Sequence, residues 1–286
     1  MMEKNDVKLY EVLRRASLFL EENGREPKFA ELLMMDCLQV SRTHVLTMMR
    51  DPVPEAVRKQ FWQGIEQHAE TGVPLEHLTG KASFYGRDFR VDEHTLIPRP
   101  ETEELVEKVV QTVSREPVTI VDIGTGSGVI AITLALELPQ AIVYATDISE
   151  DALAIARQNA AMLGADVTFL HGDSLVPLKQ ENLQPDILVS NPPYIAESDR
   201  STLADTVKDF DPELALFAGS DGMSAYKKII ADLPQVMKRP GHVFLEIGDE
   251  QGPAIKSLMQ RDLPNSDTAI HPDINGKNRI THTTIP

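Results

Sequence analysis

The chain has 286 residues, 42% of them hydrophobic and 25% charged, which is typical of a folded protein of one large or two moderate domains and excludes disordered and fibrous classes. The net charge is −16, with −3 on residues 1–80 and −13 on residues 81–286, and so acidic a chain disfavours a nucleic-acid partner because it repels phosphate backbones. One cysteine, Cys37, excludes an internal disulfide, and no signal peptide or membrane-length apolar run is recognisable, so we expect a cytoplasmic protein without membrane association.

The first eighty residues predict a small helical bundle. Apolar side chains recur three or four positions apart from Leu9 to Leu20, and Gly24 is placed to end that helix. Further helical stretches are expected at residues 27–38, 41–49 and 54–70. We therefore interpret residues 1–80 as an N-terminal helical domain with no catalytic cluster of its own.

A β-hairpin is expected next. Two short β-type runs, Ala82–Tyr85 and Asp88–Val91, flank Gly86, which suits a tight turn. We interpret residues 81–97 as a β-hairpin linker and residues 98–286 as a second domain.

That second domain alternates strands and helices. Strand candidates are Val118–Ile123, Ala141–Thr146, Val167–Leu170, Asp186–Ser190 and His242–Ile247. Helix-like runs lie between them, and this alternation predicts a parallel sheet covered by helices on both faces. The expected class is therefore α/β, with a Rossmann-like domain after the helical bundle.

A glycine-rich turn, Asp122–Gly128, directly follows the first of these strands. Glycines at a strand-to-helix turn let the backbone approach a ligand closely. A dinucleotide fingerprint would have its third glycine one residue later, so a pyrophosphate ligand is disfavoured. The spacing resembles the nucleoside-binding turn of S-adenosylmethionine-dependent methyltransferases, although a turn for another ligand remains an alternative. The candidate cofactor-binding residues here are Gly124, Thr125, Gly126, Ser127 and Gly128.

Acidic residues follow the next two strands. Asp147 lies nineteen positions after Gly128, near the offset of about 20 residues expected of a ribose-binding acid. Its carboxylate can accept hydrogen bonds from both ribose hydroxyls, whereas the alternative is an N-cap for the following helix, a role that Ser149 also suits. Asp173 and Ser174 are candidates for contact with the adenine, with an ordinary turn aspartate as the alternative.

The tetrapeptide Asn191-Pro192-Pro193-Tyr194 follows the fourth strand and is the candidate catalytic motif. The nitrogen of a planar amine or amide is a poor nucleophile because its lone pair is delocalised. The Asn191 side-chain oxygen and the Pro192 carbonyl can each accept one N–H of such a group and direct the nitrogen. Pro193 stiffens the turn, and the Tyr194 ring can lie against the acceptor. This chemistry needs no metal, and we also count Asn191 among the cofactor-lining residues. A proline-stiffened turn is the alternative.

Almost the whole chain resembles the bacterial peptide-chain release factor glutamine methyltransferases, the PrmC or HemK family. Asn-Pro-Pro-Tyr alone identifies only a reaction type, because it recurs in DNA and RNA amino-methyltransferases. More particular are the helical N-terminal domain and the segments Pro74–Gly80, Phe84–Gly86, Leu96–Glu103 and Asp211–Gly219. The closing segment Asp273–Arg279 departs from the family pattern at Asn278, where an acid is common, and this puts one local contact in doubt.

The resemblance implies a class I S-adenosylmethionine-dependent enzyme that methylates the glutamine of the Gly-Gly-Gln motif in class 1 release factors, on its side-chain amide nitrogen. It implies that residues 1–80 help to dock the release factor. It also implies that the glycine turn and Asp147 hold the cofactor and that Asn191–Tyr194 hold the glutamine amide.

Three other functions stay open at this point. The first is a related methyltransferase acting on a ribosomal-protein glutamine or on an exocyclic amine of nucleic acid, the second of which the acidic catalytic half disfavours. The others are a non-catalytic nucleotide-binding module, against which the intact tetrapeptide argues, and a nicotinamide-dependent oxidoreductase, against which the glycine spacing argues.

Overall fold

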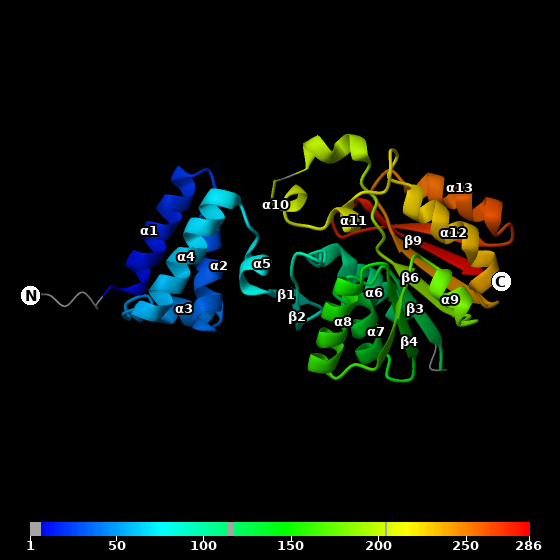
Figure 1. Ribbon diagram of the computed structural model, residues 1–286, viewed down its shortest axis with the longest axis horizontal. Helices are drawn as coiled ribbons and strands as arrows, with labels where there is room; N and C mark the ends of the chain where they lie inside the picture. Colours follow the sequence, from blue (N-terminus) through cyan, green and yellow to red (C-terminus); the bar gives the residue numbers. More distant parts are fainter. Residues whose placement is uncertain (1–6, 114–116, 204) are drawn as a thin grey trace, which may run out of the picture. The chain divides into compact units, whose positions relative to one another are not determined.

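The computed structural model describes residues 7–113, 117–203 and 205–286, and the chain divides into two compact units (Figure 1). The first unit comprises the residues up to Gly80 together with the short segment 205–210. The second unit comprises the remaining described residues, so the hairpin after Gly80 belongs to it and does not stand apart as a linker. No pattern in the sequence indicates that residues 205–210 belong with the N-terminal helices.

The first unit is built from helices. Their bounds are α1 (Leu9–Glu22), α2 (Lys28–Leu38), α3 (Arg42–Thr47), α4 (Glu55–Thr71), α5 (Leu75–Thr79) and, from the distant segment, α10 (Asp205–Lys208). Ser41 caps α3 by accepting a hydrogen bond from the His44 N–H, and left-handed Gly72 ends α4. The apolar faces of the helices meet in one core, in which Phe61 and Ile65 of α4 are fully buried.

The second unit contains a seven-stranded sheet in the order β5-β4-β3-β6-β7-β9-β8. The strands are β3 (Thr119–Ile123), β4 (Ile142–Asp147), β5 (Val167–His171), β6 (Ile187–Ser190), β7 (Gly241–Glu246), β8 (Asp267–Pro272) and β9 (Asn278–Ile285). The first five in the spatial order are parallel, as expected.

Two further strands of this sheet, β8 and β9, are not among the strands predicted from the sequence. Strand β9 runs antiparallel to both β7 and β8. The physical reason is the short connection 273–277 between β8 and β9, which suits a hairpin and is far too short for the crossover that parallel strands require. The sheet is therefore mixed, with its parallel part at the site described below.

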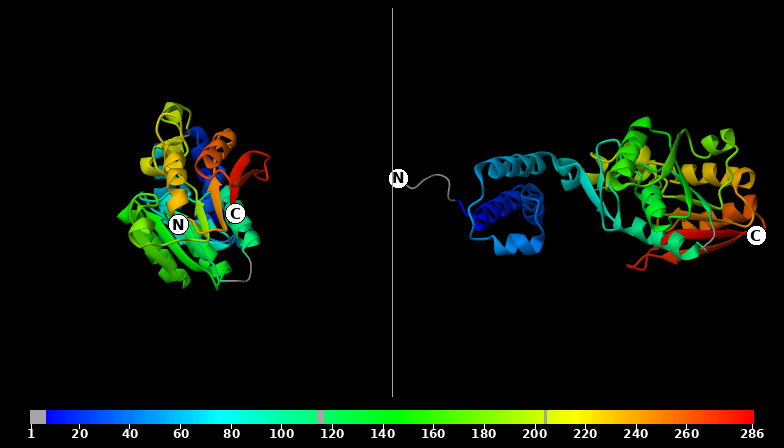
Figure 2. Two further views of the ribbon diagram at one scale, coloured as in Figure 1. Left: turned by 90° about the vertical axis from the view of Figure 1, so that its right-hand side faces the viewer. Right: turned by 90° about the horizontal axis from the view of Figure 1, so that it is seen from below.

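Helices cover both faces of this sheet (Figures 1 and 2). One face packs against α6 (Pro100–Thr112), α7 (Val129–Glu137) and α8 (Glu150–Leu163), and the other against α9 (Val176–Gln180), α12 (Ser224–Val236) and α13 (Gly252–Asp262). Neighbouring residues of β3 enter opposite layers, Ile120 the first and Val121 the second. This two-sided burial explains why the parallel strands are continuous apolar runs in the sequence.

The hairpin of β1 (Lys81–Phe84) and β2 (Arg87–Arg90) buries Phe84 and Phe89 against the first helical layer. Asn159 of α8 accepts a hydrogen bond from the Arg90 N–H and donates one to the Arg90 carbonyl. The connection from β6 to α12 contains η1 (Glu197–Thr202) and α11 (Glu213–Leu216). No helix within the described ranges is long and apolar enough to cross a membrane.

Candidate active site

The two motifs singled out in the sequence meet at one edge of the parallel strands. The glycine turn follows β3, and Asn191–Tyr194 follow β6, which pairs with β3. From β3 the strand order runs outward through β4 in one direction and through β6 in the other. Such a switch point, at the carboxyl ends of the strands, is where open α/β sheets bind ligands. We call the turn with Asp147 the cofactor half, and Asn191–Tyr194 with their side-chain partners the acceptor half.

The three glycines of the turn all have left-handed backbone conformations, with φ of 71° at Gly124, 56° at Gly126 and 85° at Gly128. A Cβ atom built on Gly124 or Gly126 would meet no described atom within 4 Å, so open space lies before this part of the turn. A Cβ atom on Gly128 would lie 2.7 Å from Cδ1 of Ile132. The first two glycines therefore leave room for a ligand, whereas the third permits close packing.

Asp147 ties the turn to the end of β4. Its Oδ2 accepts a hydrogen bond from the Gly126 N–H at 2.8 Å, and its Oδ1 accepts one from the Ser149 N–H at 2.9 Å. The N-cap of α8 is Ser149, whose hydroxyl accepts from the Ala152 N–H. Burial raises the pKa of Asp147, which is 9% exposed, while the backbone donors oppose that shift. The carboxylate is thus fixed beside the turn, with an acceptor lone pair remaining on each oxygen.

A second carboxyl group, Asp122, lies behind the turn and is missing from the sequence-based site. It is fully buried in β3, and its Oδ2 accepts a hydrogen bond from the Thr125 hydroxyl at 2.6 Å. Burial raises its pKa to about 7, and the nearby charge of Asp147 adds to that shift. Its signal in the sequence is an acidic residue at the penultimate position of β3, between the apolar Val121 and Ile123. Thr125 and Asp122 together brace the turn from within the sheet.

Asp173 and Ser174 are the residues expected near an adenine, and they contact different parts of the structure. Asp173 forms an ion pair with Lys228 of α12, and both side chains are about half exposed. Ser174 has a φ of 54°, and its carbonyl accepts a hydrogen bond from the Thr146 hydroxyl at the end of β4. The Ser174 hydroxyl is buried and has no hydrogen-bond partner among the described residues. Contact of these two residues with an adenine stays a prediction.

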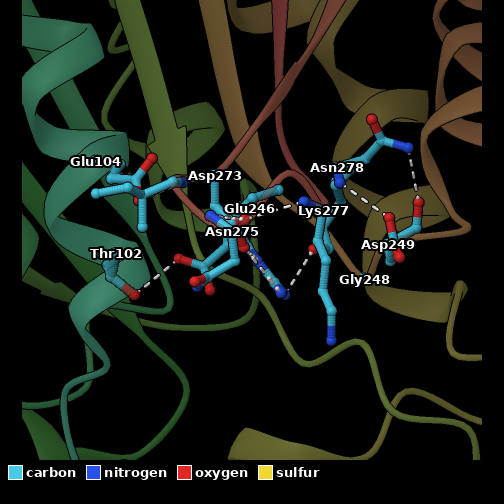
Figure 3. Close-up of polar contacts among 12 residues, drawn as sticks. Thr102, Glu104, Glu246, Gly248, Asp249, Asp273, Asn275, Lys277 and Asn278 are labelled. Atoms are coloured by element: carbon cyan, nitrogen blue, oxygen red, sulfur yellow. Dashed lines mark hydrogen bonds and ion pairs between the residues drawn. The ribbon is translucent and has the colours of Figure 1, made fainter.

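The side-chain amide of Asn191 is held by a chain of two hydrogen bonds. Its Nδ2 donates to the Thr102 hydroxyl oxygen at 3.2 Å, and the Thr102 hydroxyl donates to Oε2 of Glu246 at 2.7 Å. Figure 3 shows the second of these contacts. Thr102 lies in the first turn of α6, and Glu246 is the last residue of β7. Sequence reasoning missed both residues as parts of the site.

The backbone after the tetrapeptide is clamped from two sides. Nε2 of Gln251 donates to the Tyr194 carbonyl at 2.9 Å, while Oε1 of Gln251 accepts from the Gly248 N–H. The Ile195 N–H donates to the Leu216 carbonyl at 3.0 Å. Burial raises the pKa of the Tyr194 phenol, so the ring is neutral. The turn is therefore part of a supported strand end, not a free loop.

Two segments that carried the family resemblance also meet. Asp211 accepts hydrogen bonds from the Ile97 N–H at 3.2 Å and from Nη2 of Arg99 at 2.6 Å. Arg99 directly precedes α6, which carries Thr102. The contact therefore fixes the start of the helix that holds Asn191.

The closing segment 273–279 lies against the end of β7 (Figure 3). Arg279 forms an ion pair with Asp273 at 3.4 Å and donates to the Ile247 carbonyl at 3.2 Å. Asn278 donates through its backbone N–H to Oδ1 of Asp249 and through its Nδ2 to the Asp249 carbonyl. The amide at position 278 thus supplies a donor that an acid would lack, beside a residue that is already acidic.

The open space and the carboxylate at the glycine turn suit a nucleoside ligand. Open space before Gly124 and Gly126, with a fixed carboxylate beside it, fits a ribose-bearing cofactor such as S-adenosylmethionine. The amide oxygen of Asn191 is turned away from Thr102 and can accept a hydrogen bond from an acceptor group. Within the described ranges, no three His, Cys, Asp or Glu side chains gather in a way that could hold a metal ion.

Comparison with known proteins gives matches over both units. Residues 101–210 match the family described as "Methyltransferase small domain", and residues 11–80 match the "PrmC N-terminal domain". A release factor glutamine methyltransferase from Bacillus cereus is 43% identical over 278 residues, covering 96% of this chain and 98% of the relative. A protein of the same name from Staphylococcus aureus is 44% identical over 270 residues, covering 94% and 96%.

A solved methyltransferase structure from Pyrococcus furiosus resembles the chain with a TM-score of 0.52 and 17% identity, covering 71% of this chain and 90% of that one. At this identity the likeness concerns the fold alone. It agrees with the mixed sheet and its two helical layers.

Proposed function

The chain belongs to the family of release factor glutamine methyltransferases, and on that premise we propose its reaction. It transfers a methyl group from S-adenosylmethionine to the side-chain amide nitrogen of a glutamine in a peptide-chain release factor. The acceptor is the glutamine of the Gly-Gly-Gln motif in class 1 factors. The two matched families and the relatives' near-complete coverage support this assignment for both units of the chain.

One observation supports a planar NH₂ group as the acceptor most strongly: Nδ2 of Asn191 donates a hydrogen bond to Thr102, so the side-chain oxygen lies on the side away from Thr102. The side-chain oxygen of Asn191 is therefore the atom left to meet a substrate. A primary amide presents two N–H donors, so two acceptors are needed to hold it. We assign these to the Asn191 side-chain oxygen and the Pro192 carbonyl, which are adjacent in the chain.

Holding both N–H groups fixes the direction in which the amide nitrogen attacks. The nitrogen presents its remaining lobe away from the two acceptors, and the neutral Tyr194 ring packs on the planar amide. The ring face also stabilises the positive charge that develops on the nitrogen during transfer. After transfer, the nitrogen loses one proton to solvent, so no strong base is required.

The cofactor half holds S-adenosylmethionine through residues 124–128 and Asp147. When bound, this cofactor supplies an electrophilic methyl group on a positively charged sulfonium sulfur. Asp147 accepts hydrogen bonds from the ribose hydroxyls with the lone pairs that Gly126 and Ser149 leave free. Asp173 and Ser174 are assigned to the adenine end of the same cofactor.

Residues 1–80 dock the release factor, and the second unit performs the chemistry. The match of residues 11–80 to a domain family of their own supports a distinct role for them. Binding energy from contacts far from the glutamine can orient the reacting amide. A short glutamine peptide without these contacts should therefore react much more slowly than the intact factor.

The test is a methyl-transfer reaction with S-adenosylmethionine and three separate acceptors: a class 1 release factor, the same factor with its Gly-Gly-Gln glutamine replaced, and nucleic acid. Peptide mass spectrometry then locates any added methyl group. We expect one methyl group on that glutamine, none on the replaced factor and none on nucleic acid. Labelling of nucleic acid alone, or of the replaced factor, would contradict the proposed acceptor.

A further inference from the structure

Two buried side chains beside Asn191, Thr102 and Glu246, take no direct part in the transfer described above. Thr102 is 2% exposed and Glu246 is 1% exposed. They lie on α6 and β7, whereas Asn191 follows β6. The register pairs Ser190 with Leu245, so the next residues, Asn191 and Glu246, leave adjacent strands side by side. Burying the Glu246 carboxyl group costs free energy, so we expect this group to serve a function.

The direction of the two hydrogen bonds follows from counting hydrogens. A threonine hydroxyl has a single hydrogen, and an ionised carboxylate can only accept. When Glu246 is ionised, the Thr102 hydrogen is therefore committed to Glu246, and the Thr102 oxygen can only accept from Asn191. This forces the NH₂ end of the Asn191 amide toward Thr102 and the oxygen end away from it.

The opposite orientation would not serve the reaction. If the amide of Asn191 were rotated by half a turn, its NH₂ group would face the NH₂ group of the incoming glutamine. Two donors cannot hydrogen-bond to each other, and the acceptor nitrogen would lose one of its two partners. The side-chain amide has no intrinsic preference between the two orientations, so something outside Asn191 must select one.

We propose that Thr102 and Glu246 are positioning residues that lock the Asn191 side-chain amide with its oxygen toward the substrate glutamine, an inference that rests on the proposed function. Neither residue touches the reacting atoms. The Thr102 hydroxyl donates its hydrogen to the Glu246 carboxylate and accepts one from Asn191. The Asn191 side-chain oxygen therefore faces the substrate amide.

Two arginines favour the ionised form of Glu246 against the effect of its burial. Burial raises the pKa of Glu246 to about 7, whereas the Thr102 hydroxyl, Arg279 of β9 and Arg99 before α6 lower it and Glu101 raises it further. The phenols of Tyr194 and of Tyr226, whose hydroxyl donates to the Glu246 backbone carbonyl at 2.7 Å, are the other titratable groups that face it. Both phenols stay neutral because burial raises their pKa. Two arginines are therefore directed at the residue that ends the hydrogen-bond chain.

The first test compares Thr102→Val with Thr102→Ser. Valine has nearly the shape of threonine but cannot accept a hydrogen bond, whereas serine retains the hydroxyl. We expect Thr102→Val to lower kcat on the release factor about 10- to 100-fold, with little change in the KM for the factor, and Thr102→Ser to keep most of the activity. Thr112→Val, at the other end of α6, is the matched control, because the Thr112 hydroxyl donates to the Lys108 carbonyl of its own helix.

A second readout does not depend on turnover. In the NMR spectrum of the wild-type protein, the Nδ2 hydrogens of Asn191 should show slowed exchange with solvent, and Thr102→Val should remove that protection while Thr102→Ser retains it. A third readout is the pH profile of kcat, which should fall on the acidic side in the wild type and flatten in Glu246→Gln. Glutamine still offers an acceptor to Thr102 but does not titrate.

The outcomes separate this inference from the function on which it rests. If the wild type methylates the factor and Asn191→Ala does not, but Thr102→Val keeps wild-type kcat and Nδ2 protection, the positioning role is overturned and the function stands. Equal loss in the valine and serine variants would also overturn it, because the hydroxyl would then be irrelevant. If the wild type leaves the factor unmethylated, the proposed function fails, and the NMR comparison still decides whether Thr102 orients Asn191.

Discussion

The cofactor half and the acceptor half lie at the same edge of one sheet, yet their principal binding side chains, Asp147 and Asn191, are held by different kinds of contact. In the cofactor half, the Asp147 carboxylate binds main-chain N–H groups, those of Gly126 and Ser149, which lie 21 and 2 positions away in the chain. In the acceptor half, side chain binds side chain: Asn191 contacts Thr102 across 89 positions, and Thr102 contacts Glu246 across 144.

This difference predicts how each half responds to change. A site built on main-chain donors keeps its shape as long as the turn conformation survives, so replacing one side chain should mainly weaken ligand binding. A site built on a chain of side-chain hydrogen bonds depends on the chemical identity and protonation of every member. Variants of the acceptor half should therefore change the rate, and variants of the cofactor half should change the affinity.

The largest effect is expected at Asn191. Asn191→Ala removes an acceptor that holds the reacting nitrogen and should lower kcat about 100-fold or more at saturating substrates. Asn191→Asp retains an acceptor but brings a second negative charge toward Glu246 and beside the sulfonium site, so we expect it to be crippled as well. Steady-state kinetics would measure this, with Asn265→Ala, in the exposed loop before β8, as the control. Wild-type turnover in Asn191→Ala would refute the mechanism.

Asp147 should give the next largest effect, and on binding. Asp147→Ala removes a charge-assisted acceptor for the ribose, which is worth about 1.5–3 kcal/mol, or about a 10- to 150-fold higher Kd for S-adenosylmethionine. Titration calorimetry would measure it. Asp151→Ala, on the exposed first turn of α8, provides the comparison. Unchanged affinity in a folded Asp147→Ala protein would leave Asp147 only a structural role in the turn.

Alanine substitutions at Gly126 and Gly128 should distinguish a glycine that leaves room for the ligand from one that allows close packing. Gly128→Ala forces a Cβ atom to within 2.7 Å of Ile132 at a left-handed φ, and should lower the free energy of unfolding by about 1–3 kcal/mol. Gly126→Ala meets open space and should cost only the conformational strain, about 1 kcal/mol, while weakening cofactor binding. Chemical denaturation and calorimetry on the pair would show this. Equal losses of stability would contradict the distinction.

The last effect should appear in the pH dependence of stability. The pKa of buried Asp122 is raised to about 7, so between the unfolded value of about 3.8 and about 7 the folded protein keeps a proton that the unfolded chain releases. The contribution to the free energy of unfolding should therefore decrease as the pH rises through this window. Asp122→Asn should flatten that decrease, whereas Asp166→Asn, at an exposed position, should not. Denaturation across pH 4–8 measures the slopes, and identical slopes would show that Asp122 is not the source.

The same contrast explains what could be predicted from the sequence. The glycine turn and Asp147 are linked through neighbouring strands in a regular alternation, so their meeting followed from the pattern. Thr102 and Glu246 could not be found in this way, because their contacts depend on the packing of α6 over β7 and on the direction of individual hydrogen bonds. The antiparallel pairing of β9 was missed for a similar reason: β7 and β9 are distant in the chain, and an alternating strand does not specify its partner.

The most direct test of this division is to measure two constants in each of two variants: the Kd for S-adenosylmethionine, and the single-turnover rate of methyl transfer to the release factor at saturating cofactor. The account predicts a crossover. Asp147→Ala should weaken the Kd and keep most of the rate, while Asn191→Ala should lose the rate and change the Kd by no more than about threefold. Parallel losses of both constants in both variants would contradict it, because the two halves would then act as a single unit.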